Sequence, residues 1–258
     1  MSKKELNRVK IVGQTLISTS EKRLLAFLAS KIAGGEKVFV VTPNPEFLVF
    51  ARHNPWFEAI LKKADMAIPD GVGLVWASRF LGQPIKERIS GTDLMEKLCQ
   101  KAAKRKWSVY LIGGQLGVAE KTLAVLKKRY PRLKGWAKSG PELELINGEW
   151  SPKTKEEMAK AVKEINAQKP DLLFVAFGMG KQEKFIADNW NKLKVKLAMG
   201  VGGAFDYLSG RVPRAPNWVR NAGLEWFYRL FRQPWRWKRQ LRLLEFVWLV
   251  VRERFSSK

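Results

Sequence analysis

Short apolar runs alternate along this chain with stretches of helical periodicity, and this alternation constrains the fold more than any other feature of the sequence. Five runs are rich in apolar residues and almost uninterrupted by polar ones: Val38–Val41, Met66–Ile68, Ser108–Ile112, Leu172–Phe177 and Leu197–Val201. Strands that helices cover on both faces have this composition. The pattern therefore predicts an α/β fold with a Rossmann-like, doubly wound and mostly parallel sheet.

Helical patterns fill the intervals between these runs. Helices are predicted over Pro45–Arg52, Gly73–Leu81, Asp93–Lys106, Val118–Tyr130, Lys155–Gln168 and Lys181–Leu193. Ser90, with Asp93 following it, is typical of a capping box at the start of a helix. The opening segment Val9–Ile17 is expected to form a small extra strand or hairpin. Composition changes near Gly210, which predicts a Rossmann-like domain over residues 1–210 and a basic, amphipathic, helical appendage over residues 211–258.

Polar and glycine residues follow every one of the five predicted strands. The segments are Thr42–Glu46, Pro69–Gly73, Gly113–Gly117, Gly178–Glu183 and Gly202–Asp206. In a parallel α/β sheet, ligands bind outside the carboxyl ends of the strands, and the amides of helix N-termini favour phosphate. A single glycine cluster is also what a simple turn requires, but five at one edge predict a ligand site.

Known nucleotide-binding motifs are incomplete in this chain. The segment GGQLG lacks the G-x-G-x-x-G spacing, no acidic residue closes the following run LKGWAKS, and the P-loop pattern is absent. These absences weaken the dehydrogenase and NTPase interpretations and leave open a nucleotide diphosphate held by backbone amides. Cys99 and His53 are the only residues of their types, and no Asp or His cluster has metal-ligand spacing. No disulfide, metal ion or cofactor is therefore predicted.

Asp70 is the first candidate for chemistry at this edge. It lies between Pro69 and Gly71, where a strand should end and the chain turn. A partly desolvated carboxylate there could act as a general base; the alternative is an ordinary turn or N-cap aspartate. Thr42 and Asn44, in a loop stiffened by prolines, offer hydrogen bonds suited to a hydroxyl-rich ligand, or else form a turn and a helix cap.

The stretch from Arg211 to Lys258 combines basic and aromatic side chains. It holds twelve Lys or Arg residues, three Glu and five of the eleven Trp, within a net charge of +24 for the whole chain. Such a stretch predicts a membrane surface, a lipid phosphate or a nucleic acid as partner, or else a pair of packed helices with solvated arginines. Its longest apolar run, Phe246–Val251, is too short to span a bilayer. An apolar face is expected from Trp226, Phe227, Leu230 and Phe231, with Trp235 and Trp237 beyond a break at Pro234.

Six ordered motifs carry a resemblance to a known family. They are TPNPE, IPDGVG, RISGTDL, YLIGG, FVAFGMGKQE and VGGAFDYLSGRVPRAP, and the resemblance covers about Val38 to Arg242. In this order and at these separations they resemble the WecG/TagA/CpsF family of bacterial glycosyltransferases. The resemblance implies transfer of a sugar, typically N-acetylmannosamine or a relative, from a UDP-sugar to a polyprenyl-diphosphate-linked sugar. It also implies an inverting, metal-independent reaction that serves teichoic acid, common antigen or exopolysaccharide assembly.

The resemblance gives expected roles to residues at the strand ends. Asp70 would take the proton of the acceptor hydroxyl, and Thr42 and Asn44 would orient the acceptor or donor sugar. Gln182 would bond the donor sugar or its diphosphate, and Arg88 would reach an acidic or phosphate group or else be an exposed charge. The remaining contacts to UDP are expected from Gly113, Gly114, Gly202, Gly203, Phe205 and Asp206.

The tail then has two expected roles. Arg211, Arg214 and Arg220 would close over the cleft and neutralise the leaving diphosphate, while the tryptophans would lie on an anionic membrane. The enzyme would thus be peripheral on the cytoplasmic face of the bacterial plasma membrane, or the tail could pair with a second copy of the chain. A nucleic-acid-binding module is a rival that leaves the polar strand ends without a role, and a nucleotide-dependent oxidoreductase is a rival that lacks the dinucleotide motif. No nucleic acid partner is expected.

Overall fold

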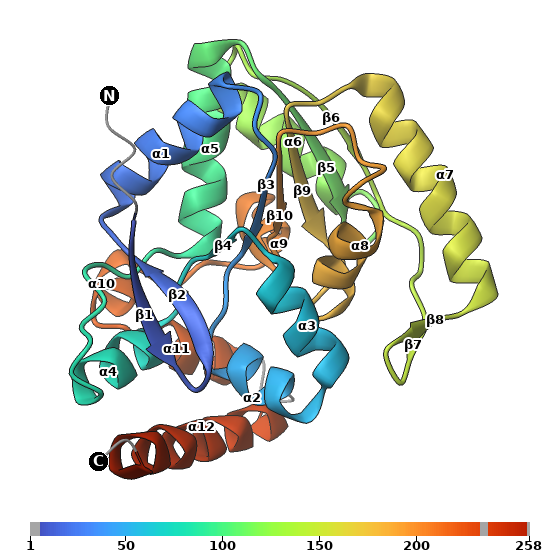
Figure 1. Cartoon of the computed structure of the whole chain (residues 1–258). Coiled ribbons are helices and arrows are strands. Elements are labelled where there is room, and N and C mark those ends of the chain that lie inside the picture. The colour runs from blue at the N-terminus through green and yellow to red at the C-terminus, as the bar shows by residue number, and fades with distance from the viewer. Residues whose placement is uncertain (1–5, 233–236, 257–258) are drawn as a thin grey trace.

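The computed structural model describes residues 6–232 and 237–256, and a six-stranded sheet lies at its centre (Figure 1). The strands are β3 (Val38–Val41), β4 (Met66–Ala67), β5 (Ser108–Gly113), β6 (Lys134–Lys138), β9 (Leu172–Ala176) and β10 (Leu197–Gly200). They lie in the order β4-β3-β10-β9-β5-β6, and every neighbouring pair is parallel. The Rossmann-like sheet predicted from the apolar runs is confirmed.

Alternate residues of each strand face opposite layers of helices, and this builds two core clusters. In β3, Phe39 and Val41 belong to one cluster, and Val38 and Val40 belong to the other. The first is closed by α2 (Pro45–His53), α3 (Pro55–Lys63), α7 (Pro152–Gln168) and α8 (Lys181–Asn189), and the second by α1 (Glu21–Ala33), α5 (Gly91–Arg105) and α6 (Val118–Arg129). Because both faces are buried, the central strands are apolar throughout.

Among the described residues, two helices of nine or more residues lie where the sequence predicted none. They are α1, which begins after Ser20, and α3, which begins at Pro55 directly after α2. The six predicted helices are present with somewhat different ends, including α4 (Val72–Phe80). The opening segment forms an antiparallel hairpin of β1 (Asn7–Ile11) and β2 (Gln14–Ser18), as expected. A small hairpin of β7 (Leu145–Ile146) and β8 (Glu149–Trp150) follows β6, and the short helix α9 (Ala204–Leu208) follows β10.

The described residues after Gly210 include α10 (Asn217–Asn221), α11 (Glu225–Arg232) and α12 (Trp237–Ser256). Helix α12 crosses beneath α2 and α4, and its Phe246, Leu249 and Val250 are buried in the same core cluster as α2 (Figure 1). The C-terminal helix therefore shares a core with the sheet. The break expected at Pro234, and Trp235 beyond it, lie outside the described residues. Among the helices that the structure describes, none is long and apolar enough to cross a membrane.

Candidate active site

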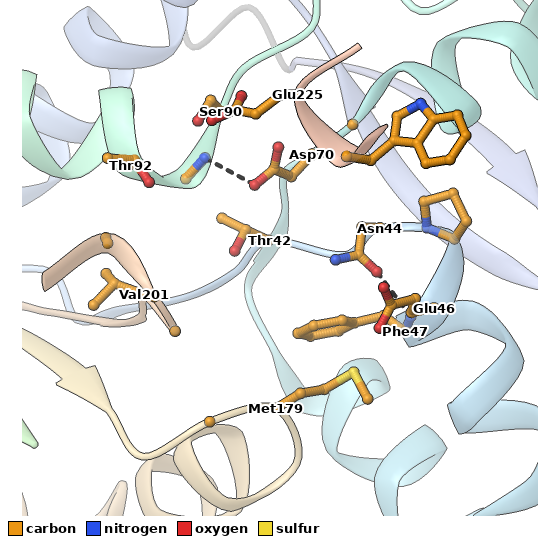
Figure 2. A pocket seen from close by; sticks show the side chains of 18 of the residues that line it. Thr42, Asn44, Glu46, Phe47, Asp70, Ser90, Thr92, Met179, Val201 and Glu225 are labelled. Carbon is orange, nitrogen blue, oxygen red and sulfur yellow. Dashed lines mark hydrogen bonds between the residues drawn. The ribbon is translucent and has the colours of Figure 1, made fainter. Parts of the chain in front are cut away.

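The five predicted strand ends open into one cleft with a volume of about 1030 Å³. Thr42, Asp70, Gly114, Gly178 and Gly202 each follow a different strand, and all of them line it. Figure 2 shows Thr42 and Asp70 on one side of this space and Met179 on the opposite side. The sheet thus brings together polar segments that lie far apart in the sequence.

The loops after β3 and β4 lock together and set the position of Asp70. The amide of Asp70 donates a hydrogen bond to the carbonyl of Pro43 (2.8 Å). Gly73 packs so closely on the ring of Pro45 that a Cβ there would lie 2.7 Å from the Pro45 Cγ, and Gly71 has a φ of +100°. Both positions therefore require glycine, one for close approach and the other for its backbone conformation. The TPNPE and IPDGVG segments act as one unit that directs the Asp70 carboxylate into the cleft.

The Asp70 carboxyl is enclosed by protein but remains partly exposed to the cleft. Its Oδ2 accepts a hydrogen bond from the amide of Gly91, at the start of α5 (3.1 Å; Figure 2). Desolvation raises its pKa to about 6, and the negative charge of Glu225 adds to the rise, whereas the Gly91 bond and the Arg88 guanidinium oppose it. A carboxylate with this pKa is deprotonated at neutral pH and is a stronger base than an ordinary aspartate.

Thr42 and Asn44 lie on the loop beside Asp70. Asn44 is the N-cap of α2, and its Oδ1 accepts a hydrogen bond from the amide of Phe47 (3.0 Å). The helix cap is therefore real, yet the Asn44 side-chain nitrogen points into the cavity (Figure 2). Thr42 is buried against Gly91, where a Cβ would lie 3.2 Å from the Thr42 Oγ1. The cleft wall thus carries a hydroxyl, an amide donor and a carboxylate side by side.

Gln182 lines the opposite part of the cleft and is held by two hydrogen bonds. Its Oε1 accepts from the amide of Gly202 (3.0 Å), and its Nε2 donates to Oε1 of Glu183 (2.7 Å). Glu183 is fully buried, accepts a second hydrogen bond from the amide of Gly180 (2.8 Å), and has its pKa raised to about 7 by desolvation. A Cβ at Gly200 would lie 2.7 Å from both side chains, so this glycine makes room for them. The Gly202 amide is therefore engaged by Gln182.

The other predicted nucleotide contacts divide into two groups. Gly114, Gly203 and Asp206 line the cleft. Gly113 is not among the described residues that line it, and a Cβ there would lie 2.7 Å from the carbonyl oxygen of Ala176 on β9, so packing within the sheet explains this glycine. Phe205 also borders the cleft but is buried in a core cluster.

The tail arginines differ in where they lie. Arg211 lines the cleft and pairs with Asp206 (3.3 Å). Arg214 and Arg220, in the part of the chain described, do not line it and are instead bound to Asp93. Arg214 binds Asp93 through two nitrogens (2.6 and 2.9 Å) and Arg220 through one (3.5 Å). The tail is thus anchored to the first turn of α5.

The expected capping box is wrong, and Arg214 is the reason. Ser90 does occupy the N-cap position of α5, but its side chain makes no capping hydrogen bond. Its Oγ accepts a hydrogen bond from Arg214 instead (3.3 Å), and Asp93 is taken by the same guanidinium. Burial by itself would raise the pKa of Asp93, but the hydrogen bond and charge of Arg214 hold that pKa below its ordinary value. A charge-assisted, bidentate pair is stronger than a neutral cap.

Arg88 lies between the tail and the base. It lines the cleft, and its Nη2 donates a hydrogen bond to the carbonyl of Arg220 (2.9 Å). Its positive charge opposes the rise of the Asp70 pKa. The Arg88 guanidinium is therefore close enough to the Asp70 carboxylate to interact with it electrostatically. Arg88 is half-buried rather than a freely exposed charge.

One residue that the sequence does not predict at the site approaches Asp70 from the tail. Glu225, at the start of α11, lines the cleft beside Ser90 and Asp70 (Figure 2) and accepts a weak hydrogen bond from Arg214 (3.4 Å). A signal for it existed, because Glu225 is the only acidic residue between Arg211 and Leu244.

His53 and Cys99, the only histidine and the only cysteine of the sequence, are not among the described residues that line the cleft. His53 is exposed on α2, with Nε2 2.6 Å from Oε1 of Glu245 on α12. Cys99 is a buried free thiol on α5. Within the described ranges, no group of three or more His, Cys, Asp or Glu residues is arranged to hold a metal ion.

Comparison with known proteins identifies relatives along the whole chain. A sequence model described as the glycosyl transferase WecG/TagA/CpsF family matches residues 9–258. A protein of Bacillus spizizenii named N-acetylglucosaminyldiphosphoundecaprenol N-acetyl-beta-D-mannosaminyltransferase is 35% identical, over 100% of this chain and 95% of its own length. Proteins of the same name from Bacillus subtilis and Staphylococcus aureus are 33% and 31% identical, over 85% and 92% of this chain and 81% and 88% of their own lengths.

Proposed function

Because this chain belongs to the WecG/TagA/CpsF family and is a glycosyltransferase, we propose that it moves N-acetylmannosamine or a related sugar from a UDP-sugar to a polyprenyl-diphosphate-linked sugar. The name of the relatives specifies an acceptor of this chemistry, an undecaprenol diphosphate that carries N-acetylglucosamine. The reaction we assign inverts the anomeric centre and uses no metal ion. Its product would enter the assembly of a cell-wall or surface polysaccharide.

The observation that carries this proposal is the Asp70 carboxylate, with its raised pKa, at the meeting point of the strand ends. As the acceptor hydroxyl attacks the anomeric carbon, Asp70 takes its proton. The bond from that carbon to the UDP oxygen breaks on the opposite face, so the configuration inverts. The proton ends on Asp70 and the electron pair ends on UDP. A single base suffices for this displacement.

Cationic side chains and backbone amides would balance the charge of the diphosphates. Arg88 and Arg211 line the cleft, and the Arg211–Asp206 pair is exposed enough to exchange for a phosphate at little cost. Gly114 and Gly203 allow the chain to approach the nucleotide closely. Arg214 and Arg220 would act from behind the cleft wall by fixing Asp93 and the carbonyl that orients Arg88.

The neutral polar groups would orient the sugars. Thr42 and the side-chain nitrogen of Asn44 lie beside Asp70 and suit the acceptor hydroxyls. Gln182 and the Gly202 amide, which hold each other, would contact the donor as a rigid unit. Preorganised groups of this kind lose little entropy on binding.

The acceptor is attached to a membrane lipid, and the tail fits that location. We assign the reaction to residues 1–210, and to residues 211–258 contact with the anionic cytoplasmic face of the plasma membrane. Exposed tryptophans and a large excess of arginine favour such an interface.

A screen of UDP-sugars tests the proposal. The full chain is incubated with each donor and with N-acetylglucosamine diphosphate on a short prenyl chain, and the product is identified by mass. We expect transfer from one UDP-sugar, an inverted linkage by NMR and an unchanged rate in EDTA. Calorimetry with UDP, NAD and an oligonucleotide separates the rival classes, because only UDP should bind. Absence of transfer from every donor, or tighter binding of NAD or the oligonucleotide, would overturn the proposal.

A further inference from the structure

The cleft does not end at the polar site. Beyond Asp70 it continues along α4 towards α12, and there its lining changes from polar to apolar. Helix α4 begins directly after the Asp70 turn. A helix of nine residues is about 13 Å long, so the apolar part extends well away from the reacting groups. One continuous space therefore has two chemically different ends.

Two helix faces form the apolar end. Helix α4 contributes Trp76, Ala77 and Phe80, and α12 contributes Phe246, Val247 and Val250 at the same spacing. These six residues define what we call the apolar groove. Ala77, Phe246 and Val250 are buried and form its floor, whereas Trp76 is 69% exposed and Val247 is 52% exposed at its edges. An open apolar strip of this kind is unfavourable in water and marks a binding surface.

We propose that the apolar groove holds the first isoprene units of the lipid-linked acceptor while its diphosphate lies at Arg88. The inference rests on the proposed function, because it is the prenyl carrier that places an apolar chain next to a diphosphate. The groups of the acceptor occur in the order sugar, diphosphate and prenyl chain. One cleft holds groups suited to all three: a base for the sugar hydroxyl, a guanidinium for the diphosphate and the apolar groove for the prenyl chain.

Arg88 is the guanidinium that we assign to the acceptor diphosphate. It lines the same cleft as the groove, and one of its nitrogens is fixed by the carbonyl of Arg220 (2.9 Å). A guanidinium has five N–H donors, so others remain for phosphate oxygens. Burial of apolar surface stabilises binding roughly in proportion to the area buried. An acceptor with a prenyl chain should therefore bind more tightly than one that ends at the diphosphate.

Two soluble acceptors test the groove without a membrane. Both carry N-acetylglucosamine diphosphate, one as a methyl ester and the other as a farnesyl ester. In detergent-free solution, we expect wild-type kcat/KM to be at least about tenfold higher for the farnesyl acceptor. The variants Trp76→Ala and Val247→Asp should reduce this preference to less than about twofold and leave kcat/KM for the methyl acceptor unchanged. The matched control Trp136→Ala, on β6 at the far edge of the sheet, should keep the full preference.

The methyl acceptor also reports on folding, since a misfolded variant loses both activities. If Val247→Asp fails in this way, Trp76→Ala decides, because removal of so exposed a side chain does not unfold a domain. Equal wild-type rates on both acceptors, or a full farnesyl preference in Trp76→Ala, would overturn the groove and leave the proposed function standing. A Trp76→Ala defect seen only with vesicles would assign Trp76 to the bilayer and would also overturn it. Failure of transfer to both acceptors would overturn the proposed function and the groove together.

Discussion

Asp70 shows how a residue of ordinary type becomes a candidate base through its neighbours. Its backbone is held by Pro43, its side chain by the Gly91 amide, and its pKa is raised by burial and by Glu225. Glu225 comes from the tail and Gly91 from the start of α5. The environment of the base is therefore assembled from three distant segments of the chain.

The variant Asp70→Asn separates proton transfer from binding. An asparagine oxygen can still accept the Gly91 hydrogen bond, so the loop should keep its conformation. Transfer should fall by about 10²–10⁴-fold, the usual contribution of a general base, while UDP affinity stays within about twofold. Quenched-flow assays measure the first and calorimetry the second. The surface variant Glu156→Gln serves as a control, and turnover of Asp70→Asn within about tenfold of wild type would exclude an essential base at this position.

The raised pKa of Asp70 predicts the shape of the pH profile. A base must be deprotonated, so kcat/KM should be half its plateau value at a pH of about 6, level off above it, and approach a tenfold fall per pH unit below it. We expect a bound UDP-sugar to add negative charge near the carboxylate and to raise its pKa further, so the limb in kcat should lie at higher pH than the limb in kcat/KM. Rates measured from pH 5 to pH 8 check both points. A kcat/KM profile that stays flat down to pH 5 would contradict the assignment.

At the scale of elements, α12 has two faces with different surroundings. Phe246 is buried in the core cluster that includes residues of α2 and α4, whereas Trp248 projects from the opposite side of the helix and is exposed. Polar groups of α12 also contact the body: Glu245 lies 2.6 Å from His53, and Glu253 accepts a hydrogen bond from the amide of Val12 (2.6 Å). Deleting residues 211–258 would therefore disturb the core as well as the tail.

Substitution of one residue on each face of α12 distinguishes packing from surface function. Phe246→Ala removes a buried aromatic ring and should lower the free energy of unfolding by about 3 kcal/mol. Trp248→Ala removes an exposed side chain and should change it by less than about 0.5 kcal/mol. Urea unfolding followed by circular dichroism measures both. Equal effects of the two substitutions would mean that α12 does not pack as described.

The central strands and the Asp70 turn can be predicted from the sequence because their signals lie within a few consecutive residues. The strands β3, β5, β9 and β10 are buried on both faces, so their apolar runs are unmistakable. The sequence does not predict helix α1, although Leu24, Leu28 and Ile32 recur at helical spacing. Other apolar residues lie between them and obscure the helical periodicity. The turn at Asp70 is likewise predictable from local sequence, because its proline and glycines determine the backbone conformation of the residues next to them.

Tertiary pairing could not be predicted in the same way. Arg214 and Asp93 are 121 residues apart, and the residues around each of them give no signal that the two side chains pair. The sequence therefore predicts a capping box for Asp93 and a position over the cleft for Arg214. The same limit applies to the apolar groove, because the two helices that form it are separated by most of the chain. The sequence identifies the polar and apolar residues that take part in these contacts, but only the folded structure shows which residues contact each other.

The whole molecule combines a strong positive charge with an apolar outer stripe. Net charge is +24. On α12, Leu241, Leu244, Trp248 and Phe255 are exposed and lie at spacings that place them on one side of the helix. Arg252 stacks over the ring of Trp248 (5.4 Å). Such a face, with cations beside it, suits an anionic bilayer surface.

Replacement of one stripe residue tests membrane contact without disturbing the core. Leu244 is 70% exposed, so Leu244→Glu should fold normally, yet it places a charge where the apolar face would enter the lipid. Sedimentation with vesicles that contain anionic lipid should show at least tenfold weaker binding than wild type, a loss of about 1.4 kcal/mol. Wild-type binding should itself weaken as salt screens the positive charge. The control Ile146→Glu adds the same charge on the β7–β8 hairpin, where the side chain is 58% exposed, and should bind within about twofold of wild type. Equal losses in the two variants would point to net charge alone, and no loss in either would remove α12 from the membrane interface.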